Sequence, residues 1–244
     1  MTLERERKKM VIIYDFDGTL TPYSLAQYQI LIENGYNDKV LDEIVKKRMK
    51  KEGITVYQSY YATYKQILEK HNIEFNRANI CKGADKVNFN KGVVGYFKAL
   101  QYKNTGIKHY IVTSGLKEYI NETAIKDYVQ GVYGVTFKEK NGVYTDLDVL
   151  LDDKKKVDAI KKILEENNGD SNIVYFGDGL TDKKAFEFVH SIRGKNVFIA
   201  QGENPTTKYN QINEQGIIDK YFEPDYSNES EIRKYVEQIN AQAN

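Results

Sequence analysis

Apolar positions along this chain follow two different periods. Short continuous runs of β-favouring apolar residues, each bounded by turn residues, alternate with longer segments in which apolar residues recur every three to four positions. Continuous apolar runs are typical of strands buried on both faces of a parallel sheet, and the longer repeat is typical of amphipathic helices. The pattern predicts an α/β fold with strands at 11–14, 109–112, 172–176 and 197–200 and a possible fifth strand at 217–222.

The segment from Pro22 to about Lys86 shows only the helical period. Its apolar positions fall into three stretches, at 25–31, 40–49 and 56–68, which Asn34-Gly35 and Gly53 separate as typical helix stops. Roughly 65 residues separate strands that ought to be neighbours, far more than the dozen or so of a single crossover. We interpret this block as a small helical cap (22–86) over a core formed by 1–21 and 87–244, the alternative being that the helices simply flank the sheet.

Three further elements follow from local patterns. Helices are predicted from Leu116 to about Val129 and at 232–239, the second of which closes the chain. Alternating residues between 132 and 151, interrupted by Asn141-Gly142, predict a β-hairpin, which we interpret as structural.

Composition limits the classes of function. The 244 residues include 36 Lys and Arg against 35 Asp and Glu, so no strong global field favours nucleic acid or an anionic membrane. Cys81 is the only cysteine, which excludes an intramolecular disulfide. The three histidines are scattered, and no apolar run is long enough to span a membrane. These features favour a cytoplasmic protein without a nucleic-acid or membrane partner.

Two carboxylates stand where the first strand ends. Asp15 and Asp17 follow the apolar run, and Gly18 then breaks the extended conformation. This places both acids at the carboxyl edge of the sheet, where open α/β folds bind ligands. Close carboxylates repel unless a cation or a shared proton relieves them, so the pair favours a hard metal ion such as Mg²⁺. The alternative is an ordinary Asx turn.

A second polar group follows the strand at 109–112. Thr113, Ser114 and Gly115 come directly after it, before the predicted helix. A hydroxyl together with backbone N–H groups at a helix N-terminus can bind an oxyanion, although Ser and Thr also cap helices without binding anything.

Lysines at the start of a helix need an explanation. Asp152 and Asp153 precede Lys154, Lys155 and Lys156 at the beginning of a helical pattern, and positive charge is unfavourable at that end of a helix. Either the two acids neutralise the lysines, or one lysine turns inward to an anion.

The strand at 172–176 ends in G-D-G-L-T-D, residues 177–182. The glycines allow a tight turn that leaves Asp178 at the strand tip and Asp182 one helical turn further on. This string and D-F-D-G-T-L-T at 15–21 are the two most specific motifs in the chain.

Taken in chain order, the four segments at 15–21, 113–115, 154–156 and 177–182 resemble the four motifs of the haloacid-dehalogenase-like hydrolase superfamily. The early helical segment is similar to that of its phosphoserine-phosphatase-like branch. The resemblance implies a Rossmann-like core in which Asp15 is the nucleophile and Asp17 the general acid and base. It implies Mg²⁺ as cofactor, held by Asp15, the backbone carbonyl of Asp17 and Asp178, with Asp182 behind them or acting through water.

The resemblance also assigns the phosphate-binding residues. Ser114 is the first choice for the second motif, with Thr113 close behind and Gly115 following; Lys156 is the first choice for the third, with Lys155 as runner-up. The implied function is an Mg²⁺-dependent phosphatase that hydrolyses a small phosphomonoester. A phosphomutase or phosphotransferase with the same motifs and a non-catalytic metal-dependent binding protein are the alternatives.

The substrate is less constrained. Phosphoserine phosphatases carry a glutamate nine positions after the nucleophile, whereas this chain has Ser24 there, so we expect phosphoserine to be a poor substrate. Tyrosines of the cap would favour hydroxyl-rich or ring-bearing phosphates if some of them face the site; the candidates are Tyr23, Tyr57, Tyr60, Tyr61 and Tyr64. The sequence leaves the oligomeric state open.

Overall fold

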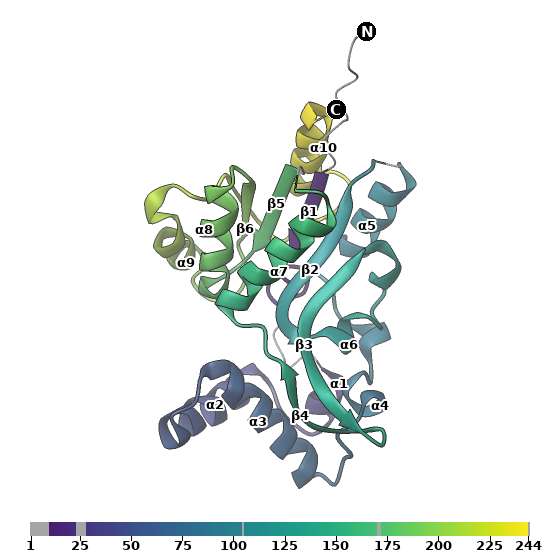
Figure 1. Cartoon of the computed structure of the whole chain (residues 1–244), viewed down its shortest axis with the longest axis vertical. Helices are drawn as coiled ribbons and strands as arrows, with labels where there is room; N and C mark the ends of the chain where they lie inside the picture. The colour runs from purple at the N-terminus through teal and green to yellow at the C-terminus, as the bar shows by residue number, and fades with distance from the viewer. Residues whose placement is uncertain (1–9, 23–27, 104, 170–171, 244) are drawn as a thin grey trace.

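The structure, a computed structural model, describes residues 10–22, 28–103, 105–169 and 172–243. A seven-stranded sheet has the order β4-β3-β2-β1-β5-β6-β7 in these ranges, and all neighbours are parallel except β3 and β4 (Figure 1). The strands are β1 (Met10–Tyr14), β2 (Lys108–Leu116), β3 (Gly131–Lys140), β4 (Val143–Val149), β5 (Asn172–Gly177), β6 (Lys195–Ile199) and β7 (Lys220–Phe222). The prediction of a Rossmann-like α/β fold is confirmed.

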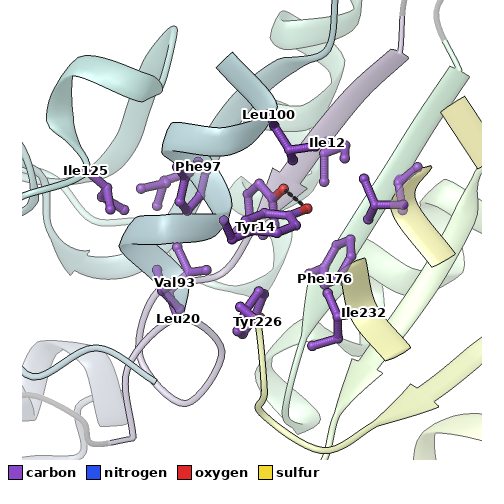
Figure 2. Close-up of a cluster of buried hydrophobic side chains, with 14 of the residues drawn as sticks. Ile12, Tyr14, Leu20, Val93, Phe97, Leu100, Ile125, Phe176, Tyr226 and Ile232 are labelled. Atoms are coloured by element: carbon purple, nitrogen blue, oxygen red, sulfur yellow. Dashed lines mark hydrogen bonds between the residues drawn. The ribbon is translucent and has the colours of Figure 1, made fainter. Parts of the chain in front are cut away.

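The central strand β1 is buried along its whole length and pairs with β2 and β5. Its alternate side chains enter two different cores. Ile12 and Tyr14 pack against α5 (Val93–Tyr102) and α10 (Glu231–Ala243), in the cluster that Figure 2 shows. Val11 and Ile13 share the opposite core with α7 (Asp153–Glu166) and α8 (Lys183–Ser191). The continuous apolar run therefore reflects burial on both faces.

A third core joins the early helices to the hairpin. The helices are α1 (Gln29–Glu33), α2 (Asp38–Glu52), α3 (Val56–Lys70) and α4 (Arg77–Ile80), followed by a 3₁₀ turn, η2 (Ala84–Lys86). They lie beyond one end of the parallel strands, beside β4 (Figure 1). Tyr64 and Phe75 of this segment pack with Phe137 of β3 and Tyr144 of β4. The hairpin therefore forms a wall against which the cap helices bury their apolar faces.

The helix predicted from Leu116 to about Val129 is wrong. Strand β2 continues to Leu116, with a register shift after Val112, and is followed by two short elements, α6 (Lys117–Ile120) and a 3₁₀ turn, η3 (Lys126–Tyr128). Thr123 ends the first of these, because its backbone N–H and its hydroxyl both donate to the Ile120 carbonyl. The apolar residues whose spacing suggested one helix belong to these two separate elements and to the turn between them.

The remaining elements agree with the expected order. Strands β6 and β7 extend the sheet, and α9 (Pro205–Ile212) and a 3₁₀ turn, η5 (Asn213–Gln215), lie between them in sequence. The predicted closing helix corresponds to α10. No helix in the described ranges is both long and apolar enough to cross a membrane.

His109 is 4% exposed, and its ring packs against those of Tyr14 and Phe97 in the first core. Its Nδ1 atom is 3.1 Å from the hydroxyl of Tyr14, which in turn is 2.9 Å from the hydroxyl of Tyr96. Burial lowers the pKa of His109 to about 3. The folded protein therefore keeps this ring neutral under conditions in which the unfolded chain protonates it, below a pH of roughly 6.5.

This difference predicts a loss of stability in acid. The stability contribution of neutral His109 is complete above pH ~6.5 and is lost as the pH falls from there towards 3. Between pH 7.5 and pH 5, His109→Gln should therefore lose about 2 kcal/mol less unfolding free energy than the wild type does. Urea denaturation at the two pH values measures this. His190→Gln, at an exposed position of α8, is the control and should follow the wild type; equal losses in all three proteins would contradict the prediction.

Candidate active site

A cavity of about 230 Å³ opens at the carboxyl ends of β1, β2 and β5, beneath α3. The core contributes the residues of the four sequence motifs, and α3 contributes three tyrosines. The lining residues are Asp15, Asp17, Tyr57, Tyr60, Tyr61, Thr113, Ser114, Gly115, Lys156, Asp178 and Thr181. Of the first-choice catalytic, phosphate-binding and metal residues assigned from sequence, Asp182 alone is absent from this lining, because it lies directly behind it.

Asp15 is fixed at the tip of β1. Its backbone N–H donates to the Phe176 carbonyl of the neighbouring strand, and its carboxylate Oδ1 accepts from the N–H of Phe16 at 2.7 Å. Oδ2 accepts from Lys156 Nζ at 2.8 Å. Burial raises the pKa of Asp15 to about 6, against the opposing effect of the Lys156 charge. Both oxygens are thus oriented by donors, and the carboxylate borders the cavity.

Lys156 joins two of the motifs. Its side chain is 1% exposed, and its ammonium donates to Asp15 Oδ2 at 2.8 Å and to Asp182 Oδ1 at 2.7 Å. Burial alone would lower the pKa of Lys156, but the two carboxylates outweigh that effect and raise it. Lys155, the runner-up, is exposed, and Asp152 caps α7 by accepting from the N–H groups of residues 154 and 155.

Asp182 supports the site from behind. Its Oδ2 accepts from the backbone N–H groups of Asp178 and Gly179, and its Oδ1 accepts from Lys156 and from the Tyr175 hydroxyl at 2.7 Å. Asp182 is fully buried. Its carboxylate therefore holds both the turn that carries Asp178 and the ammonium that reaches Asp15.

Asp178 faces the same point from β5. Burial raises its pKa well above the usual value, and the charges of Asp182 and Asp15 add to this rise. Gly18 lies against it, because a Cβ at that glycine would be 2.4 Å from Asp178 Oδ2. With φ at +80°, Gly18 also occupies backbone space that other residues rarely adopt. Glycine is therefore needed here for both the turn and the approach of the carboxylate.

Asp17 lies on the other side of Asp15, next to β2. A Cβ at Gly115 would be 3.0 Å from Asp17 Oδ2, 3.2 Å from the Tyr28 hydroxyl and 3.3 Å from Thr113 Oγ1. These three oxygens therefore surround Gly115. Asp17 is partly exposed, so its carboxylate can exchange protons with a bound molecule or with water.

The two candidate hydroxyls of the second motif differ in their bonds. The Ser114 hydroxyl donates to the Leu151 carbonyl at 2.7 Å, whereas the Thr113 hydroxyl accepts from the Gly115 N–H at 2.9 Å and keeps its own proton to donate. Both residues line the cavity. This geometry favours Thr113 as a donor to a bound anion, although Ser114 was the first choice from sequence.

Three tyrosines of α3 form the opposite wall of the cavity. Their hydroxyls donate to protein acceptors: Tyr57 to Asp153, Tyr60 to Asp42, and Tyr61 to the Ser114 carbonyl. Of the other tyrosine candidates, Tyr64 packs in the cap core, and Tyr23 lies outside the described residues.

The carboxylates suit a divalent cation. One oxygen from each of Asp15, Asp178 and Asp182 lies within 4.8 Å of the others. Among the described side chains, the cations that pair with this group are Lys156 and Lys208, whose Nζ is 4.0 Å from Asp178 Oδ2. Oxygen donors with an excess of negative charge are what hard ions such as Mg²⁺ bind. Asp17 does not belong to this group through its side chain; the family resemblance implies that its backbone carbonyl binds the metal.

Comparisons with known proteins agree with this motif order. The chain matches the family described as haloacid dehalogenase-like hydrolase over residues 12–187. The chain belongs to the haloacid dehalogenase-like hydrolase family. A search of curated proteins gave no match to this hydrolase. The predicted family is therefore confirmed, and the prediction of a hydrolase with it.

Solved structures share the fold of this hydrolase at low sequence identity. A substrate-bound phosphoserine phosphatase complex has a TM-score of 0.65 at 18% identity and covers 96% of this chain and 99% of its own. A phospho-aspartyl intermediate analogue of phosphoserine phosphatase has a TM-score of 0.63 at 19% identity, with coverages of 95% and 99%. A HAD family hydrolase from Salmonella enterica serovar Typhi has 0.63 at 15%, with coverages of 92% and 73%.

Sequence reasoning missed Tyr175 and Thr181 as parts of the site. Tyr175 reads as a core residue of β5, because its ring is buried like its neighbours; only its position facing α7 shows that its hydroxyl reaches Asp182. Thr181 lies inside the G-D-G-x-x-D string at a position that the motif leaves open.

The Tyr175 hydroxyl should measurably support the ion-pair network. In Tyr175→Phe, Asp182 Oδ1 loses one of its two donors inside the core, which should lower the unfolding free energy by about 1 to 3 kcal/mol. Tyr133→Phe is the matched control, since its hydroxyl donates to Glu166 at the surface, and it should change stability by less than about 0.5 kcal/mol. Denaturant unfolding compares them, and equal stability of the two variants would refute the role of the buried bond.

Proposed function

We propose that this hydrolase is an Mg²⁺-dependent phosphatase that cleaves a small phosphomonoester through an aspartyl-phosphate on Asp15. The observation that carries the proposal is the Asp15 carboxylate, which borders the cavity with one oxygen bonded to Lys156 and the other to the N–H of Phe16. Carboxylates in such fixed positions are established nucleophiles for phosphoryl groups.

The residues perform two displacements at phosphorus. In the first, an Asp15 oxygen attacks phosphorus, the bond from phosphorus to the alcohol oxygen breaks, and Asp17 gives its proton to the departing alcohol. In the second, Asp17 accepts a proton from water, whose oxygen attacks phosphorus and displaces Asp15. The products are the alcohol and inorganic phosphate, and both aspartates return to their starting states.

Asp15, Asp178 and the backbone carbonyl of Asp17 would hold Mg²⁺, with Asp182 behind them. The ion would supply positive charge that neutralises the oxygens of the transferring phosphoryl group. Lys156 and the Thr113 hydroxyl would complete the phosphate site, and the N–H of Gly115, which donates to that hydroxyl, would orient it. Ser114 lines the cavity beside them. The divalent-ion fit rests on the three convergent carboxylates, and the choice of Mg²⁺ rests on their hard oxygen ligands.

The size and composition of the cavity support a small substrate. At about 230 Å³ it is below the roughly 300 to 1,000 Å³ of pockets for drug-sized ligands. Two of the three structural neighbours named above are phosphoserine phosphatases, which supports a phosphate ester. Phosphoserine itself remains an expected poor substrate, although Ser24, on which that expectation rests, lies outside the described residues.

We also propose that residues 22–86 act as the cap of a core formed by 1–21 and 87–244. The single cysteine supports a cytoplasmic enzyme, and the balanced charge supports one without nucleic-acid or membrane partners. A phosphomutase would use the same residues and would reveal itself by a requirement for a bisphosphate activator.

The nucleophile is tested by Asp15→Asn. With Mg²⁺ and para-nitrophenyl phosphate, we expect the wild type to turn over and to form an acid-stable phosphoenzyme, and the variant to do neither, because an amide cannot form the acyl phosphate. Excess chelator should stop the wild type, and added Mg²⁺ should restore it. Asp158→Asn, on the exposed face of α7, should match the wild type. Near-normal turnover by Asp15→Asn would refute the role of Asp15 as the nucleophile.

The proton transfer is tested by Asp17→Asn. An amide cannot protonate the departing alcohol, so the rate on alkyl phosphates should fall by ~10² to 10⁴. Nitrophenolate needs little protonation to depart, so the loss in kcat on para-nitrophenyl phosphate should be smaller when formation of the phosphoenzyme limits the rate. Rapid-quench measurement of phosphoenzyme formation separates that step from its hydrolysis. The same penalty for both leaving groups in that step would count against Asp17 as the acid.

A further inference from the structure

The wall of the cavity opposite Asp15 is aromatic, and its polar atoms are occupied. Tyr57 and Tyr60 donate their hydroxyl protons to the carboxylates of Asp153 and Asp42, and Tyr61 donates to a backbone carbonyl. These phenols therefore keep no proton for a substrate hydroxyl. What they offer to a bound molecule is mainly the faces and edges of their rings.

The described residues that line the cavity supply no unpaired cation for a second negative group on the substrate. Among the described residues, Lys156 is the one basic residue that lines it, and Asp15 and Asp182 already bind its ammonium. Lys208, near Asp178, donates to the Gln201 carbonyl. The segment 23–27, Tyr-Ser-Leu-Ala-Gln, lies outside the described residues and contains no charged residue type.

The charge around the cavity instead favours a cation. Asp15 and Asp178 line the cavity as carboxylates and Asp182 lies behind them, against the single positive charge of Lys156. Asp17 carries the proton that it gives to the departing alcohol, and Asp42 and Asp153 stand behind two of the phenols. The charges of a bound Mg²⁺ and of a phosphate ester dianion cancel, so they leave this excess of negative charge in place. A phenol that donates to a carboxylate also carries more electron density in its ring, which strengthens the attraction of the ring face for a cation.

We propose that the substrate is the phosphate monoester of a small amino alcohol, whose ammonium or quaternary ammonium group packs against Tyr57, Tyr60 and Tyr61. This inference rests on the phosphatase activity proposed above and names the substrate class of the same site. An alkylammonium group of two or three carbons suits a cavity of about 230 Å³. Phosphoserine carries the ammonium but adds a carboxylate that would have no basic partner, which is unfavourable in a closed site.

Isosteric substrates test the charge directly. Phosphocholine and 3,3-dimethylbutyl phosphate have the same shape, and only the first carries a positive charge. With Mg²⁺ present, we expect kcat/KM to be about tenfold higher for phosphocholine, the size that cation–π contacts in a desolvated site support. Phosphoethanolamine should likewise exceed phosphoserine by at least about tenfold.

Variants locate the preference on the aromatic wall. Tyr60→Leu removes a ring, so the ratio of kcat/KM for phosphocholine to that for its neutral isostere should fall several-fold, whereas Tyr60→Phe keeps the ring and should retain most of the ratio. Because each ratio comes from a single preparation, partial misfolding cancels. Tyr102→Leu, at an exposed tyrosine of α5, is the control and should leave the ratio unchanged.

The outcomes separate this inference from the proposed function. Equal kcat/KM for the two isosteres, or phosphoserine as the best substrate, would overturn the cation site while leaving the phosphatase in place. Hydrolysis of para-nitrophenyl phosphate without hydrolysis of any amino-alcohol phosphate would do the same. Absence of turnover on every ester, para-nitrophenyl phosphate included, would overturn the phosphatase and the inference together.

Discussion

The structure of the site depends on one buried ammonium. Lys156 is 1% exposed, and a charge in that position costs several kcal/mol unless carboxylates surround it. Asp15 meets that requirement from the tip of β1 and Asp182 from the turn between β5 and α8, so the first turn of α7 is held against both. An apolar residue at Lys156 would avoid the cost of burying charge, but it would leave the two carboxylates without their partner. We therefore attribute the buried ion pair to the function of the site and not to the stability of the fold.

Close packing of the carboxylates is possible only because glycines make room for them. A Cβ on Gly177 would lie 2.6 Å from the Asp182 carboxylate, and one on Gly18 would lie 2.4 Å from Asp178. Gly18 thus allows the approach of the neighbouring segment after β5, and Gly177 allows Asp182 to fold back within its own turn. Asp182 completes the arrangement by accepting from two backbone N–H groups, which fixes the loop that presents Asp178.

Local patterns predicted what depends on local structure. The strand tips that carry Asp15 and Asp178 followed from apolar runs broken by glycine. The unfavourable charge at a helix start indicated that one lysine could turn inward, and the family resemblance selected Lys156. What the sequence left undecided depends on long-range contacts. The hydroxyl of Tyr175 is indistinguishable from that of a core tyrosine until α7 packs on it. Short turns follow Leu116 in place of the predicted helix because Thr123 donates from its side chain and backbone to the Ile120 carbonyl. Such side-chain bonds compete with helical ones, and apolar spacing does not detect them.

The cap helix α3 both lines the cavity and is bonded to the elements that carry the rest of the site. Tyr57, Tyr61 and Lys65 lie four residues apart, on one face of the helix. They bond to Asp153 on α7, to the Ser114 carbonyl at the end of β2, and to the Thr145 carbonyl of β4. The same face that supplies aromatic rings to the cavity is therefore fastened to three core elements. Asp153 begins α7, the helix that carries Lys156. A shift of α3 would therefore move the start of α7 and with it the Lys156 ammonium. The tyrosine rings and the carboxylates of the cavity are thus held in one frame, so a molecule that packs against the rings would be positioned relative to Asp15 by the same contacts.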